Sequence, residues 1–201
     1  ATLEGNDTLQ LLSYPTDRVY YLAFKNIGNG VGTPLEDVRV RQALNYAINR
    51  PGIVNVLFSG AANQISGFVV EGTLGYDESL EPYPYDVEQA QALLTEAGYA
   101  DGFEISMGCP TDAYLNINEV CLAIQRDLGA VGIDVALEFR TSSSYWSEAA
   151  YGNVGPMYVD SWSSDSGEAL NRLQGALTPG AFYAGWEDDT MTAFIAELET
   201  T

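Results

Sequence analysis

The chain has 201 residues, of which 46% are apolar, so it can bury one sizeable hydrophobic core. Its formal net charge is −20 with a single lysine, which argues against binding to nucleic acid or to an anionic membrane surface. It has no histidine and two cysteines, so neither the usual hydrolase triads nor an ordinary zinc site is expected. We predict no metal and no cofactor, and no apolar run approaches the roughly 18 residues of a membrane-spanning helix.

The first part of the chain predicts one strand followed by two helices. Residues 19–24 form a short apolar and aromatic run, which is typical of a buried strand. Asp37 is a good N-cap for a helix over residues 38–48, where apolar side chains recur every three or four residues. Pro51 suits the first turn of a second short helix that ends near Phe58.

Residues 61–85 contain glycines, two prolines and several acids, and we predict an irregular surface segment there. After this segment, Asp86 and Gln89 form a capping box that opens a helix to about Ala97, and Gly98 ends that helix. The helix again carries one apolar stripe, so it is expected to pack on the same core as the helix before it.

The second half of the chain alternates between the two kinds of element. We predict strands over residues 103–107, 133–139 and 156–159, and helices that open at Asn116, Ser144 and Glu168. A last amphipathic helix is predicted over about residues 188–198. An order of β-α-β-α-β-α implies parallel strands joined by helical crossovers, so we predict a single α/β domain.

A Ser/Gly-rich turn between the last predicted strand and the helix at Glu168 is the best candidate site from the residues alone. It contains Trp162 and Asp165 and lies where a strand gives way to a helix. Such turns lie at the carboxyl edge of a sheet, which is where open α/β sheets bind ligands. In the alternative interpretation, the turn is a solvated loop and Asp165 is only an acid near a helix N-terminus.

The two cysteines, Cys109 and Cys121, are twelve positions apart and are either a disulfide or two buried thiols. We favour a disulfide, and a loop of that size stabilises a fold by roughly 3 kcal/mol in the chain-entropy model. Both cysteines flank residues 112–114, so a bridge would also restrain that loop.

Three stretches of the sequence together resemble one protein family. The first covers residues 35–50 and reads LEDVRVRQALNYAINR, and the second covers residues 83–103, with Leu-Leu-Thr-Glu-Ala-Gly at 93–98. The third runs from Ile124 to the Trp-Ser-Ser-Asp sequence at 162–165. Their order and spacing are similar to those of the extracellular solute-binding proteins of family 5, the large binding proteins of peptide-type ABC transporters.

The resemblance implies a periplasmic-binding-protein-like α/β lobe of class II, the large peptide-binder type, with a mixed or parallel sheet flanked by helices. Family members have two lobes that enclose the ligand. Residues 1–18 would be the hinge-side segment and residues 19–201 a single ligand-binding lobe, with the first lobe of the same polypeptide missing. The implied function is the non-enzymatic binding component of an ABC importer, either periplasmic or a cell-surface lipoprotein. Its partners would be a peptide or other small solute and a membrane permease.

The resemblance also assigns roles to residues. In peptide-binding members, the Asp three positions after the Trp pairs with the ligand's α-amino group, which gives that role to Asp165 beside Trp162. Dipeptide binders hold the ligand carboxylate with an Arg and a Tyr from the loop after the strand equivalent to residues 103–107. Here Tyr114 can fill the tyrosine position, but the loop has no arginine and Asp112 adds negative charge. We therefore expect a longer peptide, a cationic compound or a neutral sugar rather than a free-carboxylate dipeptide.

A third candidate wall of the site is the loop that follows the strand at residues 133–139. It contains Ser142, and it contains Arg140 as the only cation that we expect near the site. Arg140 either faces the ligand or pairs with an acid. Tyr145 and Trp146 follow on the next helix, and we expect them to pack in the core rather than to contact ligand.

Other functions compete with peptide transport. An oligosaccharide-binding member of the same family is one alternative. A hydrolase that uses Asp165 and Glu168 as paired acids, as glycosidases do, is a second alternative from a different class. The third is an interaction module that docks a partner through an exposed apolar patch.

Overall fold

The fold is described by a computed structural model for residues 10, 12, 14, 16–147, 153–163, 167–181 and 183–200. Four strands form one sheet in the order β1-β4-β2-β3. The strands are β1 (Val19–Phe24), β2 (Phe103–Pro110), β3 (Ile133–Arg140) and β4 (Met157–Trp162). β2 runs parallel to both β3 and β4, whereas β1 pairs antiparallel with β4. The predicted α/β class with a mixed sheet flanked by helices is confirmed.

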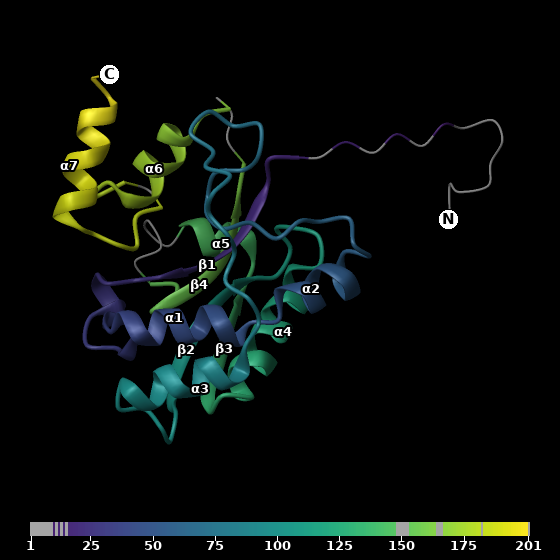
Figure 1. Ribbon diagram of the computed structural model, residues 1–201, viewed down its shortest axis with the longest axis vertical. Coiled ribbons are helices and arrows are strands. Elements are labelled where there is room, and N and C mark those ends of the chain that lie inside the picture. The colour runs from purple at the N-terminus through teal and green to yellow at the C-terminus, as the bar shows by residue number, and fades with distance from the viewer. Residues whose placement is uncertain are drawn as a thin grey trace.

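Helices α1 to α4 lie on one side of the sheet (Figure 1). Their bounds are Val38–Ala47, Arg50–Leu57, Val87–Glu96 and Ile117–Gly129, and the 3-10 turns η1 (Gly28–Gly30) and η2 (Pro34–Glu36) precede α1. Their apolar stripes pack on alternate strand residues such as Met107, Val135 and Val159. Most of the buried apolar side chains belong to this layer, so it is the main hydrophobic core.

The opposite face of the sheet carries a smaller aromatic cluster. α5 (Ser142–Ser147) places Tyr145 there, against Tyr158 of β4 and Tyr21 of β1. α6 (Ala169–Leu177) and α7 (Asp189–Leu198) contact each other and lie on the side of the sheet away from α1 and α3 (Figure 1). Because strand residues alternate between faces, every second residue of β4 from Tyr158 onward points toward this cluster.

The predicted helix caps are partly confirmed. The Asp37 carboxylate accepts the Arg39 N–H at 2.8 Å, and the Asp86 carboxylate accepts the Gln89 N–H at 2.9 Å. Asn116 is the N-cap residue of α4, as predicted, but the predicted capping bond is absent, because its side chain donates to the Leu57 carbonyl at the end of α2. The cap predicted at Ser144 is wrong, since α5 already begins at Ser142.

The predicted strand at residues 156–159 is too short, because β4 continues through Trp162. Trp162 therefore ends the strand instead of lying in the turn after it. The extension is stabilised by pairing with β1, where Val19 is opposite Trp162 and Tyr21 is opposite Asp160. Pairing with a distant strand decides where β4 ends, and local sequence does not report it.

The segment over residues 61–85 has no helix and no extended strand, as predicted. It also connects α2 to the other side of the sheet. The Phe68 ring lies 5.0 Å from the Tyr21 ring, and Leu74 forms a short parallel bridge with Glu168 at the start of α6. None of the helices in the described part of the chain combines the length and the apolar character needed to span a bilayer.

Arg172 of α6 is fully buried and holds three separate parts of the chain together. Its guanidinium donates to the Phe68 carbonyl and to the Asp17 carbonyl, and it lies 3.3 Å from the Asp17 carboxylate. A buried charge is tolerated only when such partners replace water. Arg172 thus positions the residues that lead into β1.

We expect Arg172→Met to lower the free energy of unfolding by about 2 kcal/mol, because two carbonyls lose their charged donor. Asp17 is partly exposed, so water can solvate its carboxylate in the variant and limit the loss. Urea denaturation of the two chains measures the difference. Arg172→Lys is the control, because it keeps the charge but reaches fewer acceptors, and it should lie between the two. Equal stability of Arg172→Met and the wild type would show that these bonds contribute nothing net.

Candidate ligand-binding site

The carboxyl ends of β2, β3 and β4 meet at one edge of the sheet, as their parallel directions require. The loops after β2 and β3 lie side by side there, since the Thr111 N–H donates to the Arg140 carbonyl at 2.8 Å. This is the edge at which open α/β sheets bind ligands. The candidate residues from the loop after β2, from the start of α5 and from the end of β4 therefore belong to one region.

Asp112 and Ser142, both predicted site residues, are bonded to each other. One Asp112 oxygen accepts the Ser142 N–H and the Ser142 hydroxyl, each at 2.7 Å. The hydroxyl bond, then the N–H bond, lower the pKa of Asp112. The exposed Asp112 carboxylate is therefore ionised and joins the loop after β2 to the first turn of α5.

Tyr114 lies against the end of β4. Its hydroxyl is 2.9 Å from a carboxylate oxygen of Asp160 and 3.0 Å from the Ser161 carbonyl. Its ring makes edge contacts with the rings of Tyr20 and Trp146. Tyr114 is thus positioned by its contacts with two other rings and by its hydroxyl, which gives the site a rigid aromatic wall.

Asp160 is a buried carboxylate at the centre of this region, only 1% exposed. Besides Tyr114, it accepts the Ser161 N–H at 2.7 Å and, at 3.4 Å, the Trp146 indole N–H. Burial, followed by the Asp160 charge, raises the pKa of Tyr114 and of Tyr145. Asp160 therefore places negative charge directly beneath the aromatic wall.

Tyr145 and Trp146 differ in burial. Tyr145 is fully buried and its hydroxyl donates to the Val159 carbonyl at 2.7 Å, so its predicted place in the core is confirmed. Trp146 is only partly buried and contributes to the wall beside Tyr114.

Arg18 lies over the outer side of the Tyr114 ring, with its guanidinium carbon 5.1 Å from the ring centroid. One terminal nitrogen donates to the Ser161 hydroxyl and the other to the Ser163 hydroxyl, each at 3.2 Å. The expectation that Arg140 is the only cation near the site is therefore wrong. Arg140 itself pairs with Glu138 at 3.1 Å.

Trp162 points to the face of the sheet that carries the smaller aromatic cluster, and there it packs on α6. Its ring centroid lies 4.5 Å from that of Tyr183. A Cβ atom on Gly175 of α6 would come within 2.1 Å of the indole, so only glycine leaves room for the ring. Part of the indole therefore packs against Gly175 of α6 and Tyr183. Asp165, the predicted ammonium ligand three residues on, lies outside the described residues.

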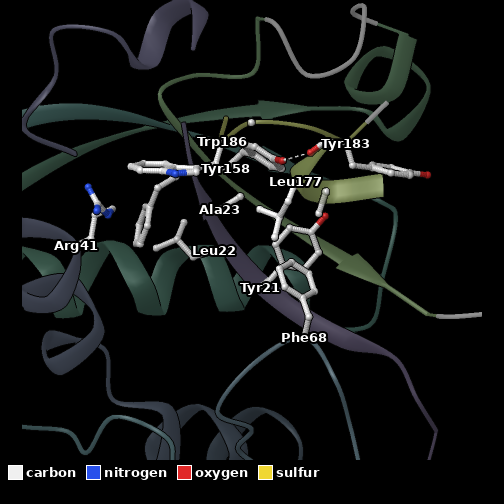
Figure 2. Close-up of a pocket in the computed structure, with 12 residues that line it drawn as sticks. Tyr21, Leu22, Ala23, Arg41, Phe68, Tyr158, Leu177, Tyr183 and Trp186 are labelled. Carbon is white, nitrogen blue, oxygen red and sulfur yellow. Dashed lines mark hydrogen bonds between the residues drawn. The ribbon is translucent and has the colours of Figure 1, made fainter. Parts of the chain in front are cut away.

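An apolar cavity of about 240 Å³ lies next to this region, on the face of the sheet that carries the smaller aromatic cluster (Figure 2). Tyr21, Phe68 and Leu177 line one part of it, and Trp186 lines another. Arg41 stacks on the Trp186 ring at 4.3 Å. Tyr183 borders the cavity and also contacts Trp162, so the cavity adjoins the site without supplying its polar groups.

Cys109 and Cys121 form a disulfide, as favoured from the sequence. Both side chains are fully buried, one near the end of β2 and the other in α4. The loop between them carries Asp112 and Tyr114, so the bridge restrains the part of the site that comes from this loop.

Sequence reasoning missed Asp160 and Arg18. A better signal for Asp160 was the alternation of Tyr158, Asp160 and Trp162, which marks one face of a strand longer than the predicted one. Arg18 directly precedes β1, and its position depends on antiparallel pairing of β1 with β4, whose Ser161 is 143 residues away in sequence. No local pattern reports that pairing.

A family model described as bacterial extracellular solute-binding proteins, family 5 Middle, matches residues 1–184. The chain belongs to this family. The predicted family is thereby confirmed. Family 5 proteins are extracellular solute-binding proteins and not enzymes, which argues against the hydrolase alternative.

Two curated relatives show how much of a family 5 protein the chain represents. The glutathione-binding protein GsiB of Escherichia coli O1:K1 / APEC is 32% identical over 173 residues, which are 84% of this chain and 33% of that protein. The dipeptide-binding protein of Escherichia coli strain K12 is 30% identical over 194 residues, 92% of this chain and 35% of that protein. The chain thus spans about a third of the length of these relatives.

Solved structures agree with the fold. AgaA of A. tumefaciens R10, in complex with agropinic acid, has a TM-score of 0.77 and 25% identity over 92% of this chain and 38% of that chain. DppA of Helicobacter pylori, in complex with the peptide STSA, has a TM-score of 0.79 at 23% identity, covering 92% of this chain and 36% of that chain. The predicted periplasmic-binding-protein-like fold is confirmed.

Proposed function

We propose that the chain is a ligand-binding lobe of the solute-binding component of an ABC importer. The observation that carries the proposal is membership of family 5 over residues 1–184. The polar and aromatic groups at the carboxyl edge of the sheet support it, because they occupy the place where α/β proteins bind ligands. The site combines a rigid aromatic wall with charged groups of both signs, which suits a small zwitterionic or polar solute.

In this proposal, residues 1–18 are the hinge-side segment and residues 19–201 form one lobe of a two-lobe protein. Ligand binds between the lobes and favours the closed form, because only that form contacts it from both sides. The closed complex then delivers the solute to a membrane permease. The protein works in the periplasm or as a lipoprotein on the cell surface.

The ligand we propose is a peptide or another small polar or cationic solute. Two curated relatives are named for glutathione and for dipeptides, which favours a peptide-like ligand over an oligosaccharide. The net charge of −20 also attracts the ammonium end of a peptide over a long range. We propose that Asp165 forms a charge-assisted hydrogen bond with that ammonium.

The test is peptide binding by the full two-lobe protein and its Asp165→Ala variant, measured by calorimetry. We expect the variant to lose about 1.5–3 kcal/mol of binding free energy, the usual value of a hydrogen bond to a charged group. A change below about 0.5 kcal/mol for every ligand would remove Asp165 from the site.

The matched control is Asp86→Ala, which deletes a carboxylate that caps α3, in the helix layer of the main hydrophobic core. It should lower stability by about 1 kcal/mol and leave peptide affinity unchanged. Native mass spectrometry of the full protein from its host would identify the solute class directly. Purification with a bound sugar and no peptide would contradict the proposed ligand.

A further inference from the structure

Arg18 differs from the other basic residues in its partners. Four arginines form ion pairs, namely Arg39, Arg126, Arg140 and Arg172. Arg41 and Arg50 donate to backbone carbonyls. Within the described residues, the bonded partners of Arg18 are two serine hydroxyls and one aromatic ring, and none of them is a carboxylate. In a chain of net charge −20, Arg18 is thus an exposed arginine with no carboxylate bonded to it in the part of the chain that the structure describes.

The described partners of Arg18 are neutral groups that hold the guanidinium in place. The hydroxyls of Ser161 and Ser163 fix its two terminal nitrogens, and Tyr114 covers one of its faces. A guanidinium has five N–H donors, and the two hydroxyl bonds use one on each terminal nitrogen. These two bonds leave three of the five donors, so hydrogen-bonding capacity remains on the guanidinium for a carboxylate.

We propose that Arg18 binds the free carboxylate of the peptide ligand. The inference rests on the proposed function and names the side chain that binds the carboxyl end of the peptide. The loop after β2 has no arginine, so Arg18, which enters the same edge from the segment before β1, is the cation that contacts the Tyr114 wall. A free-carboxylate peptide, disfavoured from the sequence alone, becomes the preferred ligand.

A purely structural role for Arg18 makes a different prediction. Arg18 is next to the β1 residue that faces Trp162, so its serine bonds also join β1 to the end of β4. Loss of these serine bonds would weaken the binding of all ligands to the same extent. Loss of a carboxylate-binding group weakens only ligands with a free carboxylate. The ratio between the two ligand forms therefore separates the roles.

The experiment uses the full two-lobe protein and a tripeptide library in two forms, free acid and C-terminal amide, mixed at equal concentration. Captured peptides are counted by native mass spectrometry. We expect the wild type to prefer the acids by about tenfold to a hundredfold, as a charged hydrogen bond allows. Arg18→Gln should reduce this preference to about one, and Arg18→Lys should give an intermediate ratio because it keeps the charge without the fork.

Arg126→Gln is the matched control. It removes the same charge from the carboxyl-terminal part of α4, which lies toward the opposite edge of the sheet because α4 runs back from β2 to the start of β3. It should keep the acid preference. Equal capture of both forms by the wild type, or an unchanged ratio in Arg18→Gln, would overturn the role of Arg18 and leave the proposed function standing. Capture of neither form would overturn both.

Discussion

The folded chain should lose stability steeply between pH 10 and pH 11. Among the tyrosines around Asp160 that have a raised pKa in the folded state are Tyr21, Tyr114, Tyr145 and Tyr158. Burial is the largest cause for each, and the Asp160 charge is the second. In the unfolded chain the same side chains ionise near the ordinary value of 10.0.

The sign follows from proton counts. Above pH 10 the unfolded chain releases tyrosine protons that the folded chain keeps, so the free energy of unfolding falls as the pH rises. Each tyrosine contributes about 1 kcal/mol between pH 10 and pH 11, or about 4 kcal/mol for the group. Domains of this kind have about 5–15 kcal/mol in total, so the loss is a large share of it.

Urea denaturation at pH 9, 10 and 11 measures the loss, and tyrosinate absorbance reports when the rings ionise. The titration of Lys25 has the opposite effect on the free energy of unfolding, and it does so at lower pH. Burial lowers its pKa to about 8, so stability gained from Lys25 grows between pH 8 and its unfolded value of 10.5. A Lys25→Met chain removes that opposing contribution. Constant stability between pH 10 and pH 11 in this variant would contradict the prediction.

Asp160→Asn is the matched variant for the electrostatic part of the effect. It keeps a side chain of the same shape beneath Tyr114 but removes the charge. We expect the pKa of Tyr114 and Tyr145 to fall in this variant while remaining above the ordinary value, because burial, the larger cause, is unchanged. Tyrosinate titration of the two chains should therefore differ, and identical curves would show that Asp160 does not affect these rings.

Loss of the Cys109–Cys121 disulfide should lower the free energy of unfolding by about 3 kcal/mol. The bridge closes a short loop, with a sequence separation of 12, and removes conformational freedom from the unfolded chain. Both cysteines are fully buried, so the Cys109→Ala/Cys121→Ala chain also loses a little packing. The measurement is urea denaturation of the oxidised wild type and of the double variant.

Reductant is the control for this prediction. It should destabilise the wild type and leave the double variant unchanged, because only the wild type has a bond to reduce. Amide hydrogen exchange of residues 111–116 should also become faster in the double variant, since the loop that carries Tyr114 is no longer tethered to α4. A wild type that is insensitive to reductant in the unfolding transition would contradict the assigned bridge.

Local patterns in the sequence were sufficient for most elements. Apolar residues at helical spacing predicted α1 and α4, and aspartates at the first turns of α1 and α3 were recognised as caps. These features depend on residues within one or two helical turns of each other, so they can be recognised without the fold. The alternation of strands and helices after β1 also predicted the parallel part of the sheet.

The arrangement of the candidate site residues was predicted only in part. Asp112, Tyr114, Ser142 and Trp162 come to one edge as expected, because they follow or end parallel strands. Their partners could not be predicted. Asp112 and Ser142 bond to each other instead of presenting separate groups, and the indole of Trp162 rests on Gly175 of α6. Such contacts depend on where whole elements pack.

Periodicity, capping and family resemblance were enough to predict the α/β fold, its family and the edge where the candidate site residues meet, because each is encoded in short stretches of chain. Only the tertiary structure decided that Asp160 is buried beneath Tyr114 and that Arg18 lies above it. The physical reason is that antiparallel pairing of β1 with β4 joins segments that are far apart in the sequence, from Val19 opposite Trp162 to Phe24 opposite Met157. That pairing is selected by the packing of both sheet faces, and no segment carries it alone.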